Sequence, residues 1–145
     1  MTPYAQRPTP AFIGASWTAL LAGALAYLVG LWNASMDLNE KGFYFTVFMY
    51  ALFSAVSLQK SVRDRLEGVP VTAIYYGLSW FSLGLSVVLL VIGLWNAELT
   101  RSEKGFFAIS CLMSLFAVVA IQKNVRDVAM LEKSTTLQNT SPEDY

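Results

Sequence analysis

Four long stretches of the chain contain no charged side chain. They cover residues 12–32, 42–59, 75–95 and 105–122. At 1.5 Å per residue, the first and third match the roughly 20 residues that a helix needs to cross about 30 Å of hydrocarbon. The second and fourth are shorter, but they can cross if flanking Lys side chains extend to the membrane surface. The pattern therefore predicts four membrane-spanning helices.

Two other interpretations of these stretches are weaker. Short apolar runs also occur in buried helices of soluble proteins, but this chain would then need four helices with almost no polar face. The first run could belong to a cleaved signal peptide, since residues 24–26 (Ala-Leu-Ala) resemble a cleavage site. The apolar run continues to Trp32, however, and its counterpart in the second half lies in mid-chain.

The second half of the chain repeats the first at a constant offset of 63 residues. The repeated motifs are Gly-Leu-Trp-Asn-Ala from 30 and 93, Glu-Lys-Gly-Phe from 40 and 103, and Gln-Lys-x-Val-Arg-Asp from 59 and 122. Each unit contains two spans joined by a short hairpin loop, so both units have the same orientation. We expect an all-α integral membrane protein of two tandem two-helix repeats, residues 12–65 and 75–128, related by an axis along the membrane normal.

The segments outside the repeats predict the orientation in the membrane. Residues 1–11, the linker 66–74 and the polar tail 129–145 belong to one side, and the two hairpin loops belong to the other. With the adjoining helix ends, the first side has seven Lys or Arg residues and the second has three. Short cytoplasmic segments carry the Lys/Arg excess, so both termini and the linker are predicted to be cytoplasmic. We expect residues 135–145 to be a solvated tail, with no enzymatic domain at either end.

Composition narrows the function further. The chain is 55% hydrophobic and 14% charged, and its 10 Lys and Arg residues balance its 10 Asp and Glu residues. Without a basic field, the chain is not expected to bind nucleic acid. It has no His, and its single Cys, Cys111, lies in an apolar run. These two facts exclude most metal sites, haem-ligand sets and catalytic nucleophile–base pairs. We expect no catalytic residue, metal or cofactor.

The two hairpin loops carry the most distinctive polar residues. Their asparagines follow the repeated Trp, where they can satisfy free carbonyls at a helix end. Asn39 and Ser102 precede the Glu-Lys pairs and are predicted to cap the following helices. Alternatively, the loops lie side by side and form one surface that a partner binds. This candidate surface consists of Asn33, Glu40, Lys41, Asn96, Glu103 and Lys104.

Aromatic and basic residues mark the two membrane surfaces. The two Trp of each unit lie 15 residues apart, about 22 Å along a helix. The predicted interface anchors are Trp17, Trp32, Trp80 and Trp95. In each unit a Lys and an Asp are spaced i,i+4, so that they can meet on one helix face. The candidate contacts for anionic lipid headgroups are Lys60, Arg63, Lys123 and Arg126.

The four spans contain no Asp, Glu, Lys, Arg or His. Proton-coupled pumps usually keep such groups in the membrane, so this activity is disfavoured. Small residues, such as Ala22, Ala26 and Gly30, are instead typical of helix packing. We therefore predict a non-enzymatic structural or accessory membrane component, surrounded by the lipid bilayer, that binds a membrane-protein partner or itself. The alternative is a small transporter or channel for a neutral or hydrophobic solute, formed by self-association.

The repeated motifs resemble those of the YiaA/YiaB family of bacterial inner-membrane proteins. The resemblance covers about residues 12–128 and rests on three motifs that recur in order in both halves. It implies a multi-pass protein of the bacterial inner membrane with two copies of a two-helix domain. It implies no activity, cofactor or site residue.

Overall fold

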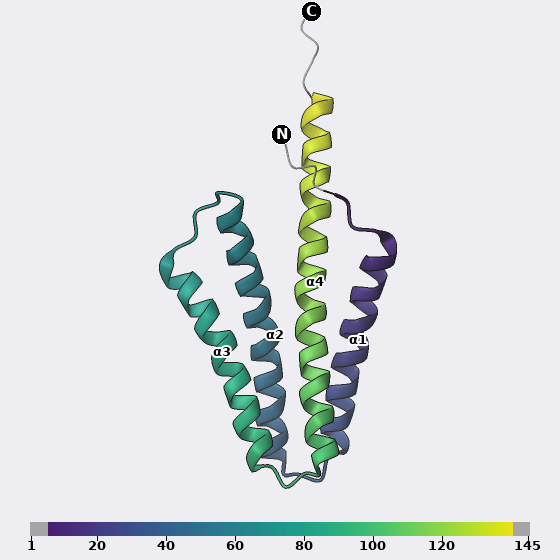
Figure 1. The fold of residues 1–145 in the computed structure, drawn as a ribbon, viewed down its shortest axis with the longest axis vertical. Helices are drawn as coiled ribbons and strands as arrows, with labels where there is room; N and C mark the ends of the chain where they lie inside the picture. Colours follow the sequence, from purple (N-terminus) through teal and green to yellow (C-terminus); the bar gives the residue numbers. More distant parts are fainter. Residues whose placement is uncertain (1–5, 141–145) are drawn as a thin grey trace, which may run out of the picture.

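A computed structural model describes residues 6–140 as four α-helices (Figure 1). They are α1 (Pro10–Asn33), α2 (Leu38–Leu66), α3 (Ala73–Asn96) and α4 (Arg101–Thr140). Each helix is long and apolar enough to cross a membrane, which confirms the four predicted spans. The loops 34–37 and 97–100 lie at one end of the bundle, called the hairpin end below. The linker 67–72 lies at the other, the linker end, with the start of α1 and the end of α4, so the two repeats have the same orientation (Figure 1).

The first helix of each repeat packs against the second helix of the other repeat. Helix α1 lies along α4, α3 lies along α2, and α2 meets α4 in the middle. Contacts within a repeat, between α1 and α2 or between α3 and α4, are minor. The two loops that join the helices of each repeat cross at the hairpin end (Figure 1). The repeats are therefore interlocked, and their order across the bundle is α3, α2, α4, α1.

Glycines allow close approach at equivalent places in the two exchanged interfaces. Gly30 of α1 faces Phe106 of α4, and Gly93 of α3 faces Phe43 of α2. A Cβ atom added at either glycine would lie 2.7 Å from the Cε1 atom of the facing ring. Both the glycines and the phenylalanines are related by the 63-residue repeat. The α1–α4 and α3–α2 interfaces are therefore built alike. Of the predicted ridge of small residues, Gly30 lies at a helix contact, whereas Ala22 is exposed.

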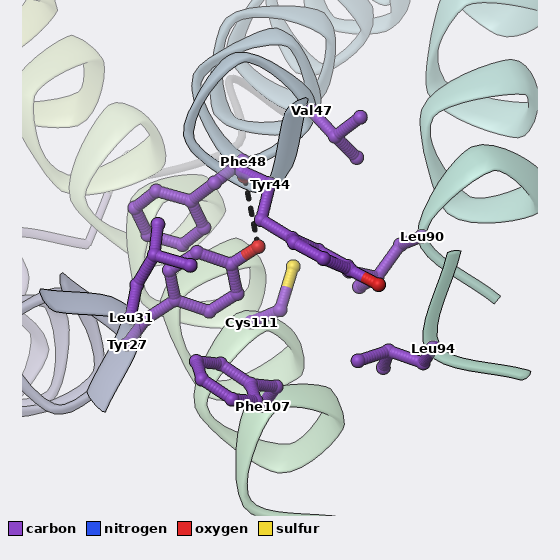
Figure 2. Close-up of a cluster of buried hydrophobic side chains, with 9 residues drawn as sticks. All are labelled: Tyr27, Leu31, Tyr44, Val47, Phe48, Leu90, Leu94, Phe107 and Cys111. Atoms are coloured by element: carbon purple, nitrogen blue, oxygen red, sulfur yellow. Dashed lines mark hydrogen bonds between the residues drawn. The ribbon is translucent and has the colours of Figure 1, made fainter. Parts of the chain in front are cut away.

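Aromatic side chains fill the core between the helices (Figure 2). Tyr27 of α1 is fully buried and stacks on Phe48 of α2, with ring centroids 4.3 Å apart. The Tyr27 hydroxyl donates a hydrogen bond of 2.8 Å to the carbonyl oxygen of Tyr44. The residues equivalent to Tyr27 and Phe48 in the second repeat are Leu90 and Cys111. The backbone is thus nearly two-fold symmetric, whereas the core that it encloses is not.

Helices α2 and α4 are capped in the same way, by the preceding residues Asp37 and Thr100 respectively. In both, the glutamate three residues later accepts a hydrogen bond from the N–H of the capping residue, at 3.1 Å for α2 and 2.8 Å for α4. This arrangement satisfies a backbone donor that the helix itself leaves free. The prediction that Asn39 and Ser102 are the caps is therefore wrong, because both lie inside the first turn.

The linker end holds one backbone conformation that favours glycine. Gly68 has a φ of +75° directly after α2, where an L side chain would be strained. Helix α4 continues past the second repeat, and residues 135–140 of the expected solvated tail are exposed but helical. The last part of that tail, residues 141–145, and residues 1–5 of the expected N-terminal segment lie outside the described residues.

Candidate functional site

The two loops of the hairpin end together line an open cavity of about 380 Å³. One wall comes from the first loop and the start of α2, and the other comes from the end of α3 and the second loop. The lining residues are Ser35, Met36, Asp37, Glu40, Tyr44, Asn96, Ala97, Glu98 and Leu99. The volume is typical of small-molecule sites. Because the loops cross, both repeats contribute to one recess.

The cavity is acidic. Three carboxylates, those of Asp37, Glu40 and Glu98, belong to its lining, which contains no basic residue. Two Lys side chains of this end are held elsewhere, since Lys41 Nζ and Lys104 Nζ each donate to the carbonyl oxygen of a Trp, at 2.9 Å and 3.4 Å. Glu98 forms no hydrogen bond or ion pair with any residue between 6 and 140. Its charge is therefore free to act on a group that enters the cavity.

Tyr44 presents a phenol hydroxyl to this cavity from α2. Its side chain is deeply buried, with the residue 5% exposed. The hydroxyl reaches across to α3, since a Cβ atom added at Gly93 would lie 3.2 Å from Tyr44 Oη. One turn further along α3, Asn96 and Ala97 line the same cavity. Within the described part of the chain this hydroxyl forms no hydrogen bond, although the backbone carbonyl of Tyr44 is bonded, and its oxygen is not among the fully enclosed polar atoms.

The structure brings together only part of the surface predicted from the repeats. Glu40 and Asn96 line the cavity. The other four predicted residues, Asn33, Lys41, Glu103 and Lys104, are not among the lining residues. Both asparagines donate through Nδ2 to the carbonyl four residues earlier in their own helix, at 2.8 Å, and not to the free carbonyls of the last turn.

The lining residues that sequence reasoning missed include three with ionisable side chains, which are Asp37, Tyr44 and Glu98. In the other repeat their equivalents are Thr100, Phe107 and Ser35, so none of the three belongs to a repeated motif. The signal that could have found them is the difference between the repeats. Repetition alone does not separate the roles, since Glu40 is duplicated and lines the cavity, whereas Asp37 is unmatched and caps α2.

A second polar cluster lies at the linker end, between α2 and α4. Arg63 of α2 pairs with Asp127 of α4, and Arg126 of α4 pairs with Asp64 of α2 at 2.5 Å. Glu67 accepts from both guanidinium groups, at 2.8 Å and 2.6 Å. The predicted i,i+4 pairs also form, with Nζ–Oδ2 distances of 2.7 Å in α2 and 2.8 Å in α4. This ion-pair cluster joins the repeats outside the membrane-spanning segments.

The ion pairs hold the carboxylates of this cluster in their charged form. A hydrogen bond from Lys60 is the main reason why the pKa of Asp64 is lowered from 3.8, and a hydrogen bond from Arg126 is the main reason why the pKa of Glu67 is lowered from 4.5. Burial raises the pKa of Asp127, but hydrogen bonds from Lys123 and Arg63 outweigh it and the net pKa is lowered. All three groups are therefore charged at neutral pH.

The predicted lipid contacts differ in how accessible they are. The side chains of Lys60 and Lys123 are about half exposed, at 53% and 51%. Those of Arg63 and Arg126 are 24% and 18% exposed, and both guanidinium groups are paired with carboxylates. Contact of these cations with lipid headgroups stays a prediction, for which the two lysines are the better placed.

The predicted tryptophan anchors lie toward the ends of α1 and α3. Trp32 and Trp95, near the hairpin end, are almost fully exposed. Trp17 and Trp80, toward the linker end, are about half exposed. Their positions suit the two membrane surfaces, and their role as anchors stays a prediction.

Comparison with known proteins identifies the family. Residues 12–64 and 75–127 each match the yiaA/B two helix domain. The chain is 54% identical over 122 residues to the inner membrane protein YiaA of Escherichia coli (strain K12), covering 84% of each chain. It is 37% identical over 68 residues to the uncharacterized membrane protein YubF of Bacillus subtilis (strain 168), covering 46% of this chain and 78% of that relative. No solved structure matches the chain. With four apolar helices and the domain present twice in tandem, the chain belongs to the yiaA/B two-helix-domain family and is a multi-pass membrane protein.

Proposed function

We propose that this protein is a non-enzymatic accessory component of the bacterial inner membrane that binds another membrane protein through its hairpin end. The acidic cavity at that end carries the proposal. Both repeats contribute to it, and Glu98 and the Tyr44 hydroxyl have no role in the helix packing described above. Polar groups presented in a recess, with no internal partner, are typical of a binding surface.

The distribution of basic residues supports an outward-facing hairpin end. The structure places Lys41, Arg101 and Lys104 at that end and the other seven Lys and Arg residues toward the linker end. The excess of basic residues on the cytoplasmic side then leaves the cavity open to the opposite side. The inner-membrane location is supported by the similarity to the E. coli inner membrane protein.

The filled core favours binding over solute passage through a single bundle. Tyr27 and Phe48 are almost completely buried and stack on one another between the helices. A solute path through one chain would have to displace this stack. Transport of a neutral or hydrophobic solute would therefore require a path between self-associated chains.

The proposal is tested by native mass spectrometry of the protein extracted with its lipids from its own membrane, at its natural expression level. We expect a stoichiometric complex with a second protein. Glu98→Lys should release that protein, because it reverses a charge in the cavity at a residue that supports no internal contact. The matched control is Glu132→Lys, the same charge change at an exposed residue of α4 toward the linker end.

The outcomes are distinct. Loss of the partner from the Glu98→Lys protein but not from the Glu132→Lys protein supports docking at the hairpin end. A homo-oligomer alone, or equal partner recovery from all three proteins, overturns the proposal. Orientation is checked separately by labelling intact cells with a membrane-impermeant maleimide, where Glu98→Cys should react and Lys133→Cys should not, both in a Cys111→Ala background.

A further inference from the structure

The geometry points to the hairpin-end cavity as a binding site for an organic ammonium cation, such as the side chain of a partner's lysine or a free polyamine. This inference rests on the proposed function, because it names the chemical group that the docking surface recognises. It is carried by three features of the cavity: its charge, its unpaired phenol hydroxyl, and the spacing of its carboxylates.

The charge of the cavity selects for a cation. Asp37, Glu40 and Glu98 give three negative charges, and no positive side chain is among the lining residues. The neighbouring Lys41 is bonded to the Trp32 carbonyl and lies 6.0 Å from the centroid of its ring, so it is held against α1. A cation that enters the recess therefore meets carboxylates that an internal salt bridge has not neutralised.

Tyr44 supplies an acceptor that the fold itself does not use. Here the hydroxyl lies at the α3 side of the cavity, on a residue that is 5% exposed, and it forms no hydrogen bond with any residue between 6 and 140. Its oxygen is not among the fully enclosed polar atoms, so a group in the cavity can reach it. Its oxygen can accept an N–H donor of a ligand, and the side-chain carbonyl of Asn96 is a second neutral acceptor on the same wall.

The arrangement fits an organic cation better than a metal ion. No three of the His, Cys, Asp and Glu side chains in the described residues are close enough to hold a metal. A metal needs several oxygen ligands within about 2.6 Å. An ammonium group instead has three N–H donors, and its alkyl chain can extend along Met36 and Leu99 in a recess of about 380 Å³.

The second repeat provides an internal control for Glu40 and a comparison for Tyr44. Glu103 caps α4 as Glu40 caps α2, yet only Glu40 lines the cavity. Phe107 occupies the position equivalent to Tyr44 and lacks the hydroxyl. Symmetry-related substitutions therefore impose the same structural change with and without an effect on the proposed site.

The test measures binding by isothermal titration calorimetry to the full-length protein in lipid nanodiscs. The probes are lysine amide acetylated on its α-nitrogen, which represents a partner side chain, and 1,5-diaminopentane, which represents a free polyamine. Tetramethylammonium carries the charge without N–H donors, and MgCl₂ represents a divalent metal. We expect at least one ammonium probe to bind. Tetramethylammonium and Mg²⁺ should each bind with a dissociation constant at least about threefold higher.

Variants locate the binding. Glu40→Gln and Glu98→Gln should each weaken binding about three- to tenfold, since each removes a charge but keeps a polar side chain. Tyr44→Phe should weaken the N–H probes and leave tetramethylammonium unchanged. Glu103→Gln should change nothing. Thermal unfolding of every variant separates a lost site from a lost fold, and Gln at position 40 can still accept the Asp37 N–H bond.

Either ammonium probe bound with this pattern supports the inference, and the tighter probe identifies the source of the cation. No binding of either probe, or equal weakening by Glu40→Gln and Glu103→Gln, overturns it. The proposed function fails separately, if native membranes yield no partner that depends on Glu98. A partner released by Glu98→Lys together with no ammonium binding would retain the docking function and reject its chemistry.

Discussion

Arg63 of α2 pairs with Asp127 of α4 across the centre of the bundle. The repeat turns this contact into two, because Arg126 and Asp64 form the reciprocal pair. The same three-residue motif, Val-Arg-Asp, therefore supplies both halves of a clasp when two copies face each other across the two-fold axis. The clasp joins the two central helices, and each central helix carries an outer helix from the other repeat.

Removing one partner of this clasp should destabilise the bundle. Asp127→Asn leaves the Arg63 guanidinium with a neutral amide beside it, and we expect the free energy of unfolding to fall by about 1–3 kcal/mol. The double variant Arg63→Gln, Asp127→Asn should lose less stability than the sum of its two single variants, because both changes remove the same contact. Reversible unfolding in mixed detergent micelles measures both effects.

The control for this experiment is Lys133→Gln, which removes a charge from an exposed site at the same end. It should change stability by less than about 0.5 kcal/mol. If the losses of the Arg63→Gln and Asp127→Asn variants simply add in the double variant, the Arg63–Asp127 contact is not an energetic pair.

The stability of the ion-pair cluster should depend on pH at its acidic side. The pKa values of Asp64, Glu67 and Asp127 are lowered in the folded protein. The contribution is therefore fully present above the unfolded values of about 4 and is lost as the pH falls through the folded values. Thermal unfolding should show that the parent protein loses stability between pH 7 and pH 3. In the double variant Asp64→Asn, Asp127→Asn this loss should be smaller by about 1 kcal/mol.

If both proteins lose stability equally over this range, the pH dependence arises elsewhere. Asp37 and Glu98, exposed carboxylates at the hairpin end, provide a comparison with the paired carboxylates of the ion-pair cluster. The variant Glu98→Gln should retain the full acid sensitivity of the parent protein, because its carboxylate supports no contact in the fold.

The sequence predicts the helices of this protein but not their pairing. The apolar runs define the spans, because membrane thickness fixes the length that a span needs. The 63-residue repeat defines the common orientation of the two units, because each unit contains an even number of spans. A loop such as residues 34–37 joins two helices without specifying whether they pack on each other. The exchange of α1 and α3 depends on how Gly30 and Gly93 fit aromatic rings of the other repeat, and this fit has no local signature.

The candidate site was predictable only in part, for a related reason. Repeated residues such as Asn33 and Glu103 attract attention because they are duplicated, yet their side chains bond to backbone groups at the ends of their own helices. The cavity depends on residues that differ between the repeats, above all Tyr44 and Glu98. Conversely, the i,i+4 pair of Lys60 with Asp64 was predictable because it is local, whereas its extension to α4 was not.

The close approach of α1 to α4 at Gly23 should make this position intolerant of a side chain. A Cβ atom there would lie 2.6 Å from Ser114 Oγ and 3.1 Å from the Ser110 carbonyl oxygen. Ser114 is fully buried and bonded to that same carbonyl at 2.8 Å, so it has little room to move. We expect Gly23→Ala to lower the free energy of unfolding by about 1–3 kcal/mol.

Gly84→Ala is the matched control, since Gly84 of α3 has no atom within 4 Å of an added Cβ. Alanine is the better helix former, so this variant should be neutral or more stable by up to about 1 kcal/mol. Detergent unfolding of the two proteins checks the prediction. Equal stability of the Gly23 and Gly84 variants would contradict the α1–α4 packing described here.

The two tyrosines of the core should respond differently to loss of their hydroxyl groups. Tyr27→Phe removes the 2.8 Å hydrogen bond to the Tyr44 carbonyl in a buried site, and it should lower the free energy of unfolding by about 0.5–1.5 kcal/mol. Tyr44→Phe removes a hydroxyl that stabilises no contact in the described structure, and its ring remains packed against α3. Its stability should change by less than about 0.5 kcal/mol.

Unfolding in detergent and ammonium binding, measured on the same two proteins, should therefore give opposite rankings. The Tyr27 variant loses stability and keeps the ligand, whereas the Tyr44 variant keeps stability and loses affinity. A Tyr44→Phe protein that unfolds more easily than Tyr27→Phe would assign that hydroxyl to the fold and remove it from the binding site.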